Sequence, residues 1–108
     1  MTDKIVVFTT CNKPEEAEQI AHALVEARLA ACVNIIGPLR SVYRWKGAVE
    51  KDTEYLLIVK TSRALLDELK AELRRLHSYE VPEVLALPVV DGSESYLAWM
   101  EQSLRDAV

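Results

Sequence analysis

The alternation of extended and helical patterns along the chain is the feature that most constrains its fold. Residues 4–11 are apolar and β-branched, which predicts a buried strand. Residues 12–30 repeat apolar side chains at three- and four-residue spacing, which predicts an amphipathic helix capped by Asn12. The later predicted elements are strands over 31–46, 54–61 and 80–92, a helix capped by Ser62 and a short last helix capped by Ser93.

This order, β-α-β-β-α-β followed by a helix, is that of the α+β ferredoxin-like sandwich, a split βαβ fold. Right-handed crossovers would place the first and third strands in the centre of the sheet, with both long helices on one face. A chain of 108 residues is typical of one domain, so we expect a single domain over residues 1–108.

The second and third strands predict an oversized β-hairpin. Cys32–Lys46 would extend about 50 Å, whereas a domain of this length has a radius of gyration of about 13 Å. The hairpin must therefore project as an arm or bend at Gly37–Pro38, and residues 47–53 would connect its strands. Tyr43 and Trp45 lie on one side of the projecting part.

Two rings on a projecting arm need a cover, since an exposed apolar patch usually marks an interaction site. A second copy of the chain is the cover that we favour, because aromatic residues are enriched at interfaces and closed homo-oligomers satisfy such patches. The alternative is that the rings of Tyr43 and Trp45 pack on the last helix, near Tyr96 and Trp99.

Composition excludes several classes of protein. The net charge of −4 argues against a nucleic-acid partner. The apolar run near the N-terminus is too short for a signal peptide or a membrane span, so we expect a cytoplasmic protein with free thiols and no membrane partner. Three glycines leave no room for a glycine-rich nucleotide loop, and no hydrolase or metalloprotease motif occurs, so no enzyme is expected.

A metal site is the main candidate chemistry. Cys11 ends the first strand just before a helix N-terminus, whose dipole would favour the thiolate. The topology brings His77 to the same edge of the domain, followed by Glu80 and Glu83. Thiolate and imidazole suit copper or zinc. The alternative is that Cys11 is simply packed and the two glutamates are solvated, and His22, off the apolar stripe of its helix, is expected in solvent.

Five motifs together resemble the CutA family, the divalent-cation tolerance proteins: LAACVNI, SVYRWKG, EYLLIVKT, HSYEVPE and YLAWM. The resemblance extends over nearly the whole chain. It implies a ferredoxin-like fold in a tight homotrimer similar to the PII signalling trimers, in the bacterial cytoplasm. It also implies a role in tolerance to divalent metals, with copper binding in some members and no required cofactor.

The resemblance also assigns residues. His77 and Glu83 match the family's H-P-Y-x-x-P-E run, in which Ser78 replaces proline here, so the metal-ligand set that we predict is Cys11, His77 and Glu83. The copper-binding cysteine of some relatives corresponds to Thr9, and Leu76 replaces the first histidine of a His-His pair.

The remaining assignments concern contacts between subunits. The family positions near the cleft between subunits correspond to Trp45, Glu54, Lys60 and Tyr96, and the arm with Tyr43 and Trp45 becomes part of the trimer interface. A second reading is a PII-like trimer that holds a small anionic ligand in such clefts.

Overall fold

Four antiparallel strands form one sheet in the computed structural model, which describes all residues 1–108. The strands are β1 (Lys4–Cys11), β2 (Cys32–Trp45), β3 (Ala48–Ser62) and β4 (Leu85–Pro88). Their order in the sheet is β2-β3-β1-β4, so the first and third strands are central, as predicted.

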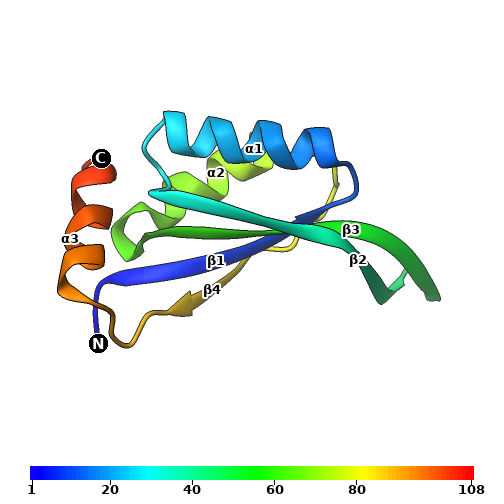
Figure 1. Cartoon of the computed structure of the whole chain (residues 1–108). Coiled ribbons are helices and arrows are strands. Elements are labelled where there is room, and N and C mark those ends of the chain that lie inside the picture. The colour runs from blue at the N-terminus through cyan, green and yellow to red at the C-terminus, as the bar shows by residue number, and fades with distance from the viewer.

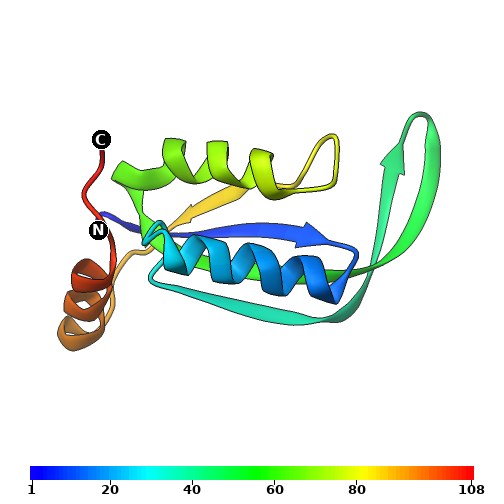
Figure 2. The same cartoon turned by 90° about the horizontal axis from the view of Figure 1, so that it is seen from above.

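Helices cover one face of this sheet and leave the other bare (Figure 1). The two long helices are α1 (Pro14–Glu26) and α2 (Leu66–Leu76), which lie side by side on the same face (Figure 2), as the handedness of the crossovers predicts. Their core residues repeat at helical spacing and are buried against Val7, Leu57 and Val59 of the sheet. The buried residues of the predicted apolar stripes are Ala17, Ile20, Ala21 and Leu24 of α1 and Leu69 and Leu73 of α2.

The helix starts agree only in part with the predicted caps. Ser93 accepts a hydrogen bond from the Tyr96 N–H and caps α3 (Glu94–Ser103), as expected. The N-cap of α1 is Lys13 rather than Asn12, because Pro14 occupies the first turn. Ser62 makes no capping hydrogen bond, since a 3₁₀ turn over Arg63–Leu65 precedes α2.

The β2–β3 hairpin projects beyond the helices as an arm (Figures 1 and 2), and the molecule measures 44 × 25 × 22 Å. The pairing shifts register between Ile36 and Leu39, where Gly37–Pro38 was predicted to bend the strand. A side chain at Gly37 would place its Cβ 2.6 Å from Tyr55 Cδ2, so the bend also needs the absence of a side chain.

The predicted connection over residues 47–53 is wrong. Lys46 and Gly47 have φ of 50° and 81°, which form a two-residue hairpin turn, and Trp45 pairs directly with Ala48. The fourth strand is also shorter than the predicted 80–92, since only Leu85–Pro88 pairs with β1. Residues 77–84 instead form a loop, which we call the 77–84 loop, and Pro82 within it could not donate a strand hydrogen bond. The edge position of β4 is confirmed.

The bare side of the sheet, the open face, is apolar. Val6 and Phe8 alternate with the buried Ile5 and Val7 along β1, so their side chains point away from the helices. Cross-strand partners share a face, which adds residues from the other three strands. The apolar residues of the open face are Val6, Phe8, Ile36, Leu56, Ile58, Leu85 and Leu87.

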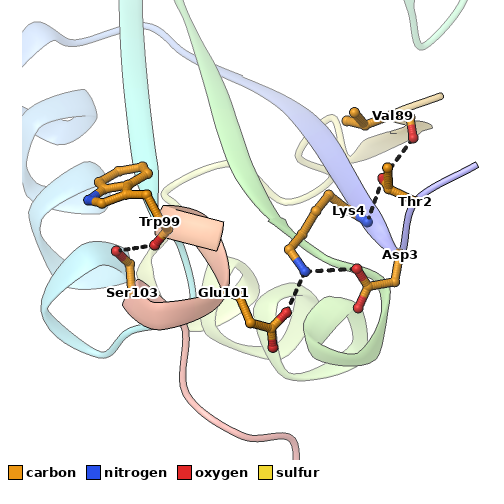
Figure 3. Close-up of polar contacts among 7 residues, drawn as sticks. All are labelled: Thr2, Asp3, Lys4, Val89, Trp99, Glu101 and Ser103. Atoms are coloured by element: carbon orange, nitrogen blue, oxygen red, sulfur yellow. Dashed lines mark hydrogen bonds and ion pairs between the residues drawn. The ribbon is translucent and has the colours of Figure 1, made fainter. Parts of the chain in front are cut away.

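The last helix is held at the end of the sheet opposite the arm (Figure 1). Lys4 lies buried between the helix and the start of β1, and its Nζ donates to Asp3 Oδ1 at 2.7 Å and to Glu101 Oε1 at 2.6 Å (Figure 3). These two hydrogen bonds outweigh the effect of burial and raise the pKa of Lys4. The alternative in which Tyr43 and Trp45 pack on the last helix of their own chain is therefore wrong, and both rings stay about 40% exposed.

Helix α1 offers a matched test of this core. We expect Leu24→Ala, at a position with no exposed surface, to lower the free energy of unfolding by about 2–5 kcal/mol, because it leaves a cavity. The adjacent Val25 is 43% exposed, so Val25→Ala should change it by less than about 0.5 kcal/mol. Urea unfolding at one fixed protein concentration measures both, and equal losses would contradict this assignment of the core face.

Candidate functional site

A cavity of about 580 Å³ lies where the arm meets the 77–84 loop. Its lining is unusual in charge, because it includes four carboxylates and no lysine, arginine or histidine. The lining also includes three aromatic side chains. The acidic residues are Asp52, Glu54, Glu80 and Glu83, and the aromatic residues are Tyr43, Trp45 and Tyr79. We call this the acidic cavity.

Glu54 and Tyr79 form the polar contact at the centre of this lining. The Tyr79 hydroxyl donates to Glu54 Oε2 at 2.7 Å, and Glu54 is only 7% exposed. Burial, followed by this hydrogen bond and the charge of Glu54, raises the pKa of Tyr79 far above its usual range. Tyr79 therefore stays a hydroxyl donor at any physiological pH.

The pKa values of two other side chains that line the cavity are also raised. Desolvation, followed by the charges of Asp52, Glu54 and Glu50, raises the pKa of Tyr43. Desolvation and then the charge of Glu54 raise the pKa of Glu83, an exposed residue of the cavity lining. Burial is the larger cause of both pKa shifts, and the neighbouring negative charges add to it.

His77 positions the loop that carries Tyr79. Its Nε2 lies 2.7 Å from the Thr10 carbonyl oxygen, which can only accept, so Nε2 carries a proton. Its Nδ1 accepts from the Tyr79 N–H at 3.0 Å. The two rings also lie 4.7 Å apart. Both imidazole nitrogens of His77 are therefore used within the chain.

Glu16 of α1 fixes the next residue of the same loop. Its two carboxylate oxygens accept from the Ser78 N–H at 3.0 Å and the Ser78 hydroxyl at 2.8 Å. Ser78 thus makes two hydrogen bonds that a proline, which the resemblance would place at this position, could not donate. Together, His77 and Glu16 hold the wall of the acidic cavity against β1 and α1.

The pKa of the Cys11 thiol differs from the prediction, because it is raised rather than lowered. Its side chain is fully buried, and its thiol donates to the Lys13 carbonyl oxygen at 3.6 Å. Burial, together with the charges of Glu16 and Glu54, raises the pKa of Cys11 although that hydrogen bond opposes the shift. This direction is opposite to the lowered pKa expected at the helix N-terminus, because desolvation outweighs the hydrogen bond to Lys13.

Cys11, His77 and Glu83 do not fit a metal ion in this arrangement. The Cys11 thiol is buried, both nitrogens of His77 are engaged within the chain, and Glu83 is an exposed residue of the cavity lining. No group of three His, Cys, Asp or Glu side chains in the chain converges closely enough to hold a metal ion. The three-residue ligand set stays a prediction from sequence. His22, 84% exposed in its side chain, lies in solvent as expected.

The four residues assigned to an inter-subunit cleft fall into two groups within one chain. Trp45 and Glu54 line the acidic cavity. Lys60 and Tyr96 lie toward the other end of β3, where Lys60 Nζ is 3.4 Å from the Tyr96 hydroxyl and 5.6 Å from the centre of its ring. The Trp99 ring lies beside that of Tyr96 at a tilt of 38°, with ring centres 5.2 Å apart. One chain alone does not bring the two groups together.

Sequence reasoning missed Tyr79 and Asp52 as cavity residues. Tyr79 is part of the HSYEVPE motif, but the strand predicted over residues 80–92 obscured the loop that turns its hydroxyl toward Glu54. Asp52 was placed in a connection, whereas it pairs with Ser41 in the arm. Alternation along a correctly placed β3 would put Asp52 and Glu54 on one side of the strand.

Comparison with known proteins places the chain among relatives of shared fold and sequence. Residues 5–103 match the family described as CutA1 divalent ion tolerance protein. The chain is 49% identical over 98 residues to the divalent-cation tolerance protein CutA of Thermus thermophilus, covering 91% of this chain and 95% of that protein. It is 45% identical over 102 residues to the chloroplastic protein CutA of Arabidopsis thaliana, covering 94% of this chain and 56% of that longer protein.

Solved structures of related proteins also match the fold of this chain. The crystal structure of CutA1 from Oryza sativa matches with a TM-score of 0.94 and 43% identity, over 96% of this chain and 95% of that one. The names of these relatives are not enzyme names. No helix of the chain combines the length and the apolar character that a membrane crossing needs.

The two histidines provide a test of the role of His77. We expect His77→Ala to lose about 1–3 kcal/mol of unfolding free energy for each of the two backbone groups left unpaired. His22→Ala should change it by less than about 0.5 kcal/mol, because His22 is exposed. Urea unfolding in the presence of a chelator measures both variants. If Cu(II) stabilised the wild type and not His77→Ala, the ring would be a metal ligand instead.

Proposed function

We propose that this chain, which belongs to the CutA1 family of divalent ion tolerance proteins, acts as a homotrimer that supports the tolerance of cells to divalent cations, copper in particular. The observation that carries the proposal is the match of residues 5–103 to that family, together with close structural likeness over nearly the whole chain.

Self-association is supported by the open face. Seven apolar side chains lie on a side of the sheet that no element of the chain covers, and Leu85, Ile36 and Leu87 are 58%, 49% and 40% exposed. A patch of this kind is costly in water, and burying apolar surface between copies contributes about 25 cal/mol per Å². Closed symmetry limits such an assembly, and a trimer is what the family resemblance implies.

The arm supports the same assembly. It carries Tyr43 and Trp45, both about 40% exposed, together with the more exposed Val42 and Val49. Tyr96 and Trp99 form a second exposed aromatic pair at the opposite end of the chain. In the proposed trimer the arm of one subunit lies against a neighbouring subunit, where the separated cleft residues Trp45, Glu54, Lys60 and Tyr96 come together.

The role in tolerance is proposed without a resident metal at Cys11, His77 and Glu83, since these side chains do not converge. The second reading, a small anionic ligand, is not favoured, because the acidic cavity would repel an anion. We propose no catalytic activity. The cytoplasm is the proposed compartment, supported by Cys11 and Cys32, which lie apart on β1 and β2 as free thiols.

Growth on copper tests this function. In cells that lack their own family member, we expect the wild-type chain to restore growth on Cu(II), and Leu87→Asp to lose most of that gain because it places a charge on the open face. Val25→Asp is the control, since Val25 has a similar exposed fraction but lies on α1. With equal protein levels, equal growth of both variants would contradict a role for the open face, and no rescue by wild type would contradict the proposed function.

A further inference from the structure

The arm that projects beyond the helices (Figure 2) has two sides of different chemistry. Successive side chains of a strand point in opposite directions. Tyr43 and Glu54 line the acidic cavity, so the residues that alternate with them along β2 and β3 lie on the other side of the arm. In cross-strand pairs these are Arg40 with Thr53, Val42 with Lys51, and Arg44 with Val49, which we call the basic side of the arm.

The cations of the basic side have no partner in the chain. Arg40, Arg44 and Lys51 are exposed, and none of them forms an ion pair. By contrast, Arg75 and Arg105 each pair with a glutamate. The carboxylates of β3 within the arm all point to the opposite side. This separation gives the basic side a local positive potential, although the net charge of the chain is −4.

Exposed valines and a hollow distinguish the basic side from an ordinary solvated run of charges. Val42 and Val49 are 66% and 63% exposed, and each lies opposite a cation of the neighbouring strand. Asp52 is the one acidic residue at the hollow, and its carboxylate already accepts from the Thr53 N–H at 2.8 Å. Apolar side chains held in water beside unpaired cations are typical of a contact surface. The hollow, of about 710 Å³, is lined by Arg40, Ser41, Val42, Lys51, Asp52 and Thr53.

The order of side chains along β2 defines the chemistry of a partner. Arg40, Val42 and Arg44 occupy every second position, so the two guanidinium groups are based about 13 Å apart with a valine between them. An extended segment with acidic residues four positions apart and an apolar residue midway has the same spacing. Its carboxylates can pair with the arginines, and its apolar side chain can cover the valine. A nucleic acid would match only the charges, because its phosphates leave the valines exposed to water.

We propose that the basic side of the arm docks an extended acidic segment of a partner protein, in which two acidic residues flank an apolar residue at alternate positions. This role goes beyond tolerance to copper and does not require it. In the trimer described above, Trp45 and Glu54 on the other side of the arm meet a neighbouring subunit. The basic side then stays free, and its three copies would strengthen the binding of a partner that carries several such segments.

Two synthetic peptides test this docking. The repeat Glu-Ser-Val-Ser places glutamate and valine alternately on one side of an extended chain. The repeat Glu-Val-Ser-Ser keeps the composition, the charge and the glutamate spacing, but it puts valine on the opposite side. Fluorescence anisotropy of labelled peptides should show saturable binding of the first peptide to the whole protein, about threefold or more tighter than that of the second. Added salt should weaken this binding.

Matched variants separate the basic side from the charge of the whole chain. Arg40→Gln should weaken binding of the first peptide about threefold or more, because it removes one charge-assisted contact. Arg74→Gln should change the affinity less than about 1.5-fold, since Arg74 is equally exposed and without an ion pair but lies on α2. Val42→Thr should weaken binding about twofold or more, whereas Val25→Thr on α1 should not. Light scattering should give all four variants the wild-type mass, which separates a loss of docking from a loss of assembly.

Three results with the peptides would overturn the proposal. These are the absence of saturable binding, equal affinity for the two peptides, and equal weakening by Arg40→Gln and Arg74→Gln. A single-stranded oligonucleotide that bound more tightly than the first peptide, and lost affinity in Arg40→Gln, would also overturn it, because the basic side would then be a site for phosphates.

Discussion

The one-sided cover of the sheet is the constraint on which the rest of the structure depends. Both long helices pack on the face of the sheet that carries Val7, Leu57 and Val59. The side chains on the other face of each central strand therefore have no helix of the same chain packed against them. That leaves apolar residues such as Phe8 and Ile58 to be covered from outside the chain. The projecting arm and the separated aromatic pairs at the two ends of the molecule are also exposed, and exposed aromatic surfaces of this kind are common at interfaces.

The acidic cavity depends on the same architecture. β3 continues past the helices into the arm (Figure 2), and Asp52 and Glu54 of this strand line the acidic cavity. The 77–84 loop then closes the space from the other side, held by His77 on Thr10 and by Glu16 on Ser78. His77, which the sequence suggested as a metal ligand, thus positions the 77–84 loop that forms one wall of the acidic cavity. The charge of the cavity comes from separate carboxylates, with aromatic rings beside them.

Sequence reasoning predicted the parts of this structure that periodicity determines. Strand order follows from the order of elements, and the stripe of Ala17, Ile20 and Leu24 is buried as its spacing requires. The predictions were wrong where the outcome depends on the conformation of a local turn or on the burial of a single group. The left-handed Lys46 and Gly47 replaced a long connection by a tight turn, and desolvation reversed the expected ionisation of Cys11. The Tyr79–Glu54 contact joins residues 25 positions apart, which no local pattern reports.

The central claim is that copies of the chain cover the open face, and the mass in solution tests it most directly. Light scattering at low micromolar concentration should give about three times the 12.2 kDa of one chain, with no folded monomer at equilibrium. A folded, stable particle of 12.2 kDa would contradict the account, because the open face and the aromatic arm would then have to remain in water.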